Sequence, residues 1–144
     1  PARGDSRGIF GHSMGGHGAL VCALRHPQQY RSVSAFAPVS SPSQVPWGRK
    51  AFTRYLGPDP ARWGDYDAAA LVRRTAFPDL ILVDQGTADK FLDEQLRPQL
   101  FADACAAAGQ ALESRMQDGY DHGYYFIATF IEDHLRHHAA RLTA

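Results

Sequence analysis

This sequence of 144 residues lacks an excess of charge of either sign, a long hydrophobic run and a set of closely spaced cysteines. Fifteen basic and fifteen acidic side chains balance, which argues against nucleic acid or an anionic membrane surface as a partner. No apolar run approaches the ~20 residues that a membrane-spanning helix needs, and no signal peptide is visible. The two cysteines, Cys22 and Cys105, fall in predicted helices, so we interpret them as buried apolar side chains in a reducing, cytoplasmic compartment.

The most informative stretch that is present is Gly-His-Ser-Met-Gly at residues 11–15, a G-x-S-x-G pattern. A short apolar strand at 8–10 precedes it, and a helix predicted over 16–24 follows it, with one apolar face formed by Ala19, Leu20, Ala23 and Leu24. A serine on such a strand-to-helix turn projects its hydroxyl above the sheet edge, and the helix N-terminus stabilises developing negative charge. The pattern makes Ser13 a candidate nucleophile; the alternative is a tight turn in which Ser13 only caps the helix.

Strands and helices alternate along the rest of the chain. Further strands are predicted at 33–36, 80–83 and 112–116, and the run 80–83 is typical of a strand buried on both faces of a parallel sheet. A helix is predicted over Glu94–Ala108 with a stop at Gly109, and Pro98 implies either a kink or a later start. Residues 124–142 have the periodicity of an amphipathic helix, with an apolar stripe of Phe126, Ile127, Phe130, Ile131 and Leu135. This order favours an α/β fold with a mostly parallel sheet flanked by helices.

Residues 40–75 differ in character from the rest of the chain. They hold four of the nine prolines and both tryptophans, with two short helical patches near 50–56 and 67–73. We interpret this segment as an insertion between strands that shapes a substrate pocket. It carries Trp47, Arg49 and Lys50, which we place near that pocket; for Trp47 the alternative is that it only packs the loop.

An acid and a base for the serine follow later in the chain. The strand at 80–83 leads into a loop with Asp84 and Asp89, of which Asp89 has the better spacing; capping of the next helix is the alternative role. His122 lies between the last strand and the last helix, where a base can meet residues at strand ends. The order Ser13, Asp89, His122 is that of the α/β-hydrolases, in which the histidine takes the serine proton and the acid orients the ring.

The remaining histidines have simpler interpretations. His12 and His17 flank the serine, and His26 lies near the end of the first helix. The three near the C-terminus, His134, His137 and His138, include a pair at i, i+4 that could bind a metal, but we expect a solvated helix face. We therefore predict no metal site.

Several of these stretches resemble one family closely. The segments FGHSMGGHGAL (10–20), SVSAFAP (32–38), VPWGRKAF (45–52), YLG (55–57), DQG (84–86) and YDHGYYFIATFIEDHLRHHA (120–139) are similar to the S-formylglutathione hydrolase, or esterase D, family of the α/β-hydrolase superfamily. The resemblance assigns the nucleophile to Ser13, the acid to Asp89 and the base to His122. Gly123 stands where members commonly carry serine. Only the C-terminal half of the family is matched, so we expect residues 1–144 to be the C-terminal part of a single α/β-hydrolase domain.

The resemblance implies hydrolysis of the thioester S-formylglutathione to formate and glutathione, the closing step of glutathione-dependent formaldehyde oxidation, without a cofactor. The backbone N–H of Met14 would supply one oxyanion donor, while the family's loop with the second donor is absent from these residues. A small thioester or ester is thus the expected partner, and a homodimer is left open. The alternatives are a general short-chain carboxylesterase or an acyltransferase with the same triad, and a non-catalytic fragment.

Overall fold

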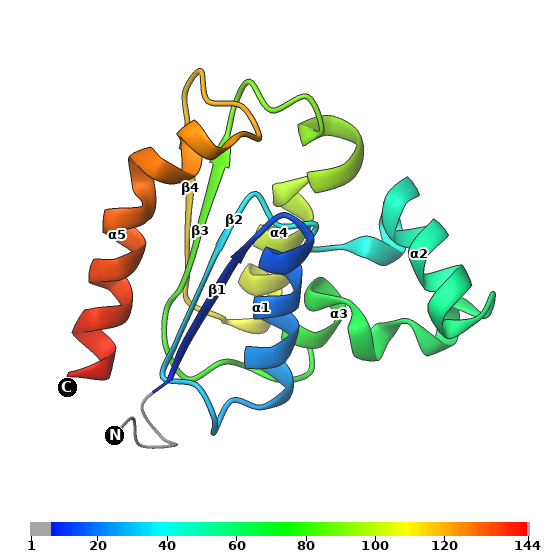
Figure 1. Ribbon diagram of the computed structural model, residues 1–144. Helices are drawn as coiled ribbons and strands as arrows, with labels where there is room; N and C mark the ends of the chain where they lie inside the picture. The colour runs from blue at the N-terminus through cyan, green and yellow to red at the C-terminus, as the bar shows by residue number, and fades with distance from the viewer. Residues whose placement is uncertain (1–6, 144) are drawn as a thin grey trace.

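The computed structural model describes residues 7–143. Its four strands form one parallel sheet in the order β1-β2-β3-β4, with β1 at Gly8–His12, β2 at Ser32–Phe36, β3 at Ile81–Gly86 and β4 at Leu112–Gln117. The central strands β2 and β3 are buried along their whole lengths because helices cover both of their faces. Since the strands are parallel, the segments that follow β1, β3 and β4 gather at one edge of the sheet (Figure 1).

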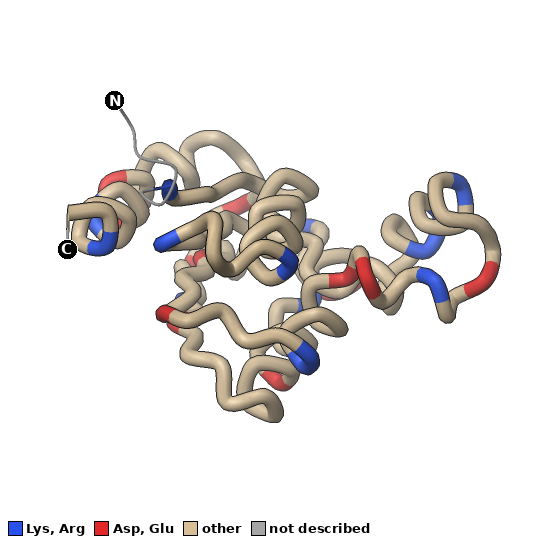
Figure 2. The backbone as a smooth tube through the Cα atoms, turned by 90° about the horizontal axis from the view of Figure 1, so that it is seen from below, with Lys and Arg blue, Asp and Glu red and all other residues tan. Residues whose placement is uncertain are grey.

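Helices lie on both sides of this sheet (Figure 1). The helices α1 (Met14–Arg25), α3 (Ala68–Val72) and α4 (Pro98–Ala108) cover one face, and α5 (Tyr124–Leu142) covers the other. The larger apolar core lies under the first group and includes Leu20, Leu24 and Val33, while a smaller one forms around Phe36 and Phe126. The helix α2 (Pro46–Leu56) lies outside these layers, beyond α1 and α3, in both views (Figures 1 and 2).

The predicted alternation of strands and helices and the parallel sheet are confirmed. The helix α1 buries Ala19, Leu20, Ala23 and Leu24 as its sequence pattern indicates. Of the two options for the helix near Pro98, the later start is correct: α4 begins at Pro98, after a separate π-helical turn at Leu92–Leu96. Proline suits the first position of a helix because it has no N–H that needs a partner there. As predicted, Gly109 ends α4 in the left-handed conformation, with φ 70°.

The prediction of a solvated histidine face near the C-terminus is wrong. His134, His137 and His138 are buried under α5 against the sheet, whereas Leu135, predicted on the apolar stripe, is 52% exposed. The physical reason is that β2 and β3 present polar side chains to this helix, and imidazole nitrogens satisfy them. Cys105 is buried and Cys22 is half-buried, and both thiols are free.

Charged residues are interspersed over the molecule rather than segregated by sign (Figure 2). Within residues 7–143, no helix combines the length and the apolar character that crossing a membrane requires.

Candidate active site

Ser13 forms the turn between β1 and α1 by itself. Its backbone has φ 57° and ψ −118°, a conformation that is rare for a residue other than glycine and that is stored at functional turns. The Ser13 N–H donates to the carbonyl of Phe36 at 2.9 Å, which ties the turn to the end of β2. Gly11 is required here because a side chain at that position would overlap the backbone of Gly15. The Ser13 side chain makes no helix-capping hydrogen bond, so the capping alternative is excluded.

His122 lies between Ser13 and Asp89 in one hydrogen-bonded chain. Its Nε2 is 2.9 Å from Ser13 Oγ, and its Nδ1 is 2.6 Å from Asp89 Oδ2. Asp89 comes from the loop after β3 and His122 from the loop between β4 and α5, and both loops lie at the carboxyl edge of the sheet. Gly86 lets these loops meet, because a Cβ there would overlap the backbone of Tyr120. The structure therefore brings together the three side chains that the sequence singled out.

The carboxylate of Asp89 is buried and accepts hydrogen bonds on both oxygens. Besides His122, Oδ2 accepts from Gln85 Nε2 at 3.1 Å, and Oδ1 accepts from the backbone N–H of Phe91 at 2.9 Å. The contact with Phe91 orders the turn that follows Asp89. Neither the segment Leu92–Leu96 nor α4 has a side-chain cap, so the capping role offered as the alternative for Asp89 is not found. Gln85 was not singled out by its sequence context; the only signal is a polar residue that directly continues a buried apolar strand.

Two rings flank the imidazole of His122. The His12 ring centroid lies 4.5 Å from it, and Phe91 packs edge-on with its centroid at 5.3 Å. Burial, together with the nearby His122, lowers the pKa of His12 below its ordinary value.

Two cavities meet this group of residues from different sides. One, of about 470 Å³, is bordered by Ser13, Met14, His17 and the face of α2 that carries Trp47. The other, of about 390 Å³, is bordered by His122, Lys90 and Asp121.

The expectation that Arg49 and Lys50 lie near the pocket is not met, whereas Trp47 does line the first cavity. Arg49 and Lys50 are exposed on the other side of α2. At about 100° per residue counted from Trp47, the residues of α2 that line the cavity, up to Leu56, lie within an arc of about 180°. Arg49 and Lys50 lie outside that arc, at about 200° and 300°.

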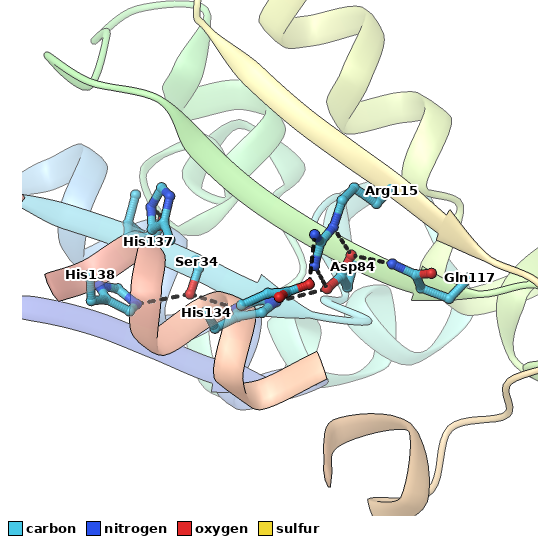
Figure 3. Close-up of polar contacts among 9 residues, drawn as sticks. Ser34, Asp84, Arg115, Gln117, His134, His137 and His138 are labelled. Carbon is cyan, nitrogen blue, oxygen red and sulfur yellow. Dashed lines mark hydrogen bonds and ion pairs between the residues drawn. The ribbon is translucent and has the colours of Figure 1, made fainter. Parts of the chain in front are cut away.

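A second polar cluster lies under α5 (Figure 3), and its residues line neither of these two cavities. Asp84 is fully buried in β3 and accepts hydrogen bonds from Arg115, Gln117 and His134. Burial alone would raise the pKa of Asp84, but these hydrogen bonds, that of Arg115 first, lower it to about 2. Among residues 7–143, no group of three or more histidine, cysteine or carboxylate side chains is arranged to hold a metal ion.

The chain is similar to known proteins in sequence and in structure. The sequence matches the esterase family, described as "Putative esterase", over residues 1–137. It is 58% identical over 138 residues to the S-formylglutathione hydrolase of Rattus norvegicus, covering 94% of this chain and 49% of the rat protein. The S-formylglutathione hydrolase of Paracoccus denitrificans is 51% identical over 142 residues, covering 99% of this chain and 50% of that protein.

Among solved structures, an S-formylglutathione hydrolase from Agrobacterium tumefaciens matches with a TM-score of 0.94 at 51% identity. That match covers 98% of this chain and 51% of the other. The predicted α/β-hydrolase fold is thereby confirmed. The chain spans about half the length of these relatives.

Proposed function

Because the chain belongs to the esterase family, we propose that it carries the catalytic triad of a serine hydrolase that cleaves S-formylglutathione to formate and glutathione. Ser13 is the nucleophile, His122 the general base and Asp89 the acid that orients it. The observation that carries this proposal is the position of His122, whose two ring nitrogens lie 2.9 Å from Ser13 Oγ and 2.6 Å from Asp89 Oδ2. The relatives named S-formylglutathione hydrolase support the thioester as substrate.

In the first half of the reaction, His122 Nε2 takes the Ser13 proton while Ser13 Oγ attacks the formyl carbon. Asp89 accepts the Nδ1–H of His122, which fixes the tautomer that leaves Nε2 free and stabilises the imidazolium. The negative charge on the former carbonyl oxygen develops at the N-terminus of α1, where the backbone N–H of Met14 is available as a donor. His122 then protonates the departing glutathione sulfur.

In the second half, His122 takes a proton from water, the hydroxide adds to the formyl-serine carbon, and formate leaves as Ser13 regains its proton. The cavity beside His122 suits the thiol product, since Lys90 and Asp121 offer charges opposite to those of the carboxylates and ammonium group of glutathione.

Replacing Ser13 tests the proposal directly. Ser13→Ala in the protein that carries this chain is expected to lower kcat for S-formylglutathione by a factor of about 10⁴ or more, because the nucleophile is lost. Thr129→Ala, on the exposed side of α5, serves as the control and is expected to retain the native rate. Turnover by Ser13→Ala at the native rate would rule out this serine as the nucleophile.

Two broader proposals accompany this assignment. We propose that residues 1–144 are the C-terminal part of a single α/β-hydrolase domain, which is supported by the half-length match to the relatives. We further propose that the reaction removes formaldehyde-derived thioester in the cytoplasm, which is supported by the free thiols of Cys22 and Cys105. A homodimer is left open as the assembly, and sedimentation of the protein would decide it.

A further inference from the structure

The cavity beside His122 is bordered by one side chain of each charge. Its volume of about 390 Å³ falls within the range of small-molecule sites. Besides His122, the titratable side chains that border it are Lys90 and Asp121, and both are exposed. Among residues 7–143, neither of them forms an ion pair, with the other or with a third residue. Two opposite charges that face one cavity without pairing favour a ligand that carries both charges.

Local contacts hold both charges near the base. The ammonium group of Lys90 lies over the ring of Phe91, 5.0 Å from its centroid. The same Phe91 ring packs edge-on against His122, with centroids 5.3 Å apart. Asp121 directly precedes His122 in the chain, and its Oδ1 accepts the N–H of Gly123 at 2.8 Å. Because both groups already have fixed neighbours, a ligand that binds them loses little affinity to the ordering of side chains.

The cavity beside Ser13 is a poor place for a charged ligand. No lysine, arginine, aspartate or glutamate is among the described side chains that border it. Burial lowers the pKa of its one histidine, His17, to about 4, so that ring is neutral at pH 7. A carboxylate or ammonium group would lose its hydration there without gaining a partner. The charged part of the substrate therefore lies on the side of His122, which also protonates the departing sulfur.

Glutathione has two charged ends, and they differ in the charges that they carry. The glycine end has a carboxylate alone, whereas the γ-glutamyl end has an ammonium group and a carboxylate on one carbon. That carbon is seven bonds from the sulfur, about 9 Å along an extended chain. This reach is sufficient, because two steps of 5.3 and 5.0 Å lead from the ring of His122 through that of Phe91 to the ammonium group of Lys90.

From these observations we infer that the γ-glutamyl end of glutathione binds between Lys90 and Asp121, an assignment that rests on the function proposed above. Its carboxylate lies at the ammonium group of Lys90, and its ammonium group lies at the carboxylate of Asp121. The glycine end makes no ion pair with either residue. Lys90 and Asp121 thus determine specificity for the thiol part of the substrate, and they take no part in proton transfer.

Neutral variants of the two residues test this assignment in steady-state kinetics of the protein that carries this chain. Lys90→Met keeps the length of the side chain, and Asp121→Asn keeps the oxygen that accepts the Gly123 N–H. Exposed ion pairs contribute up to about fivefold in affinity, so each variant should raise KM for S-formylglutathione about three- to fivefold, with kcat within about twofold. Hydrolysis of p-nitrophenyl acetate, whose leaving group has neither a carboxylate nor an ammonium group, should keep its native kcat/KM.

Matched controls separate a local effect from one of net charge. Lys50→Met and Asp93→Asn make the same changes of charge at exposed positions that border neither cavity, and both should keep the native KM. An equal rise of KM in these controls, or an equal loss for both substrates in Lys90→Met and Asp121→Asn, would overturn the inference. Native KM in Lys90→Met and Asp121→Asn, in a protein that turns over S-formylglutathione, would also overturn it and leave the proposed function intact.

Binding can be measured without turnover, with unreactive thioethers as probes. In a Ser13→Ala background, calorimetry compares S-methylglutathione with S-methyl-γ-glutamylcysteine, which lacks glycine, and with S-methyl-N-acetylcysteinylglycine, which lacks the γ-glutamyl end. The first two should bind within about threefold of each other and the third at least about tenfold more weakly, because it loses both ion pairs. Lys90→Met should weaken the binding of the first two and leave that of the third unchanged.

The binding experiment also separates the two proposals. Equal affinity for all three probes, or equal weakening of all three by Lys90→Met, would overturn the inference whether or not the native protein is active. The expected order of affinities in a protein inactive toward S-formylglutathione would support the site between Lys90 and Asp121 and count against the proposed function.

Discussion

Among residues 7–143, two serine–histidine–aspartate chains are held by hydrogen bonds, and the one that contains Ser13 borders the two cavities described above. In the first, His122 joins Ser13 to Asp89. In the second, His134 joins Ser34 to Asp84 at 2.8 and 3.0 Å (Figure 3). The hydrogen-bond distances are similar, so they do not distinguish the two.

The difference lies in access and in the backbone. Ser34 and His134 are fully buried in and under the sheet, whereas Ser13 stands on a turn with φ 57° and faces a cavity. The rings are also reversed, because Nε2 faces the serine in the first chain and Nδ1 faces it in the second. Residue types and hydrogen bonds alone therefore do not make a serine a nucleophile; the serine must also be exposed at the end of a strand.

The buried hydrogen-bonded side chains around His134 support the exposed ones around His122. Two residues of β2 bond His138: Ser34 reaches its Nε2 at 2.9 Å and Ser32 its Nδ1 at 2.6 Å. Asp84 of β3 bonds His134, so two strands hold one helix. That helix, α5, begins at Tyr124, two residues after His122. The buried polar cluster thus fixes the element from which the loop of His122 starts.

Replacing each of the two aspartates is expected to give the largest difference between the exposed and the buried set of hydrogen-bonded side chains. Asp89→Asn is expected to lower kcat by about 10⁴ with little loss of fold, because the amide no longer holds the reactive tautomer of His122. Asp84→Asn should instead leave Arg115 partly uncompensated and lower the free energy of unfolding by about 3–5 kcal/mol. Steady-state kinetics and urea unfolding on both variants separate the two roles. A loss of activity in Asp84→Asn at native stability would contradict the structural role of Asp84.

The buried histidines predict a loss of stability in acid. Burial lowers the pKa of His137 and of His138 to about 4. For His137, the positive charge of Arg141 is the second cause. In the unfolded chain these two histidines take up protons near pH 6.5, whereas in the folded chain they do not. Their contribution to the free energy of unfolding is therefore complete above pH 6.5 and is lost as the pH falls toward 4. At pH 5 the expected loss is about 2 kcal/mol for each of these histidines.

Urea unfolding at pH 7 and pH 5 measures this dependence. His137→Gln should reduce the difference between the two pH values, since one buried imidazole is removed. His26→Gln, at an exposed position, should leave the difference as it is. Equal stability of the native protein at both pH values would contradict the lowered pKa of His137 and His138.

Replacing Gln85 is expected to have the smallest effect, and it tests how the carboxylate of Asp89 is held. Gln85→Met removes the N–H that reaches Asp89 Oδ2 and keeps the length of the side chain. A hydrogen bond to a charged group contributes about 1.5 kcal/mol or more, so kcat should fall about tenfold in steady-state kinetics. A native kcat in Gln85→Met would show that Gln85 does not position the acid.

Much of the fold was predictable because its signals are local. Apolar runs located the strands, the G-x-S-x-G pattern located the turn at Ser13, and glycine and proline marked both ends of α4. The order of serine, acid and histidine picked out the residues that the structure brings together.

The parts that were missed depend on distant partners. His134 bonds Asp84, 50 residues earlier, and Ser34, 100 residues earlier, so nothing beside it in the sequence shows that it is buried. Lys50 shares a short helix with Trp47, and only the rotation of that helix decides which of them faces the cavity. Gln85 acquires its role from the fold of the loop that follows it.

Covalent labelling tests the central claim most directly. The protein is treated with a serine-directed phosphonate, and the modified residue is identified by mass spectrometry of its peptides. We expect one adduct on Ser13 and none on Ser34, despite the similar hydrogen bonds of the two serines. An adduct on a serine other than Ser13, or no adduct on a protein with a native circular-dichroism spectrum, would contradict it.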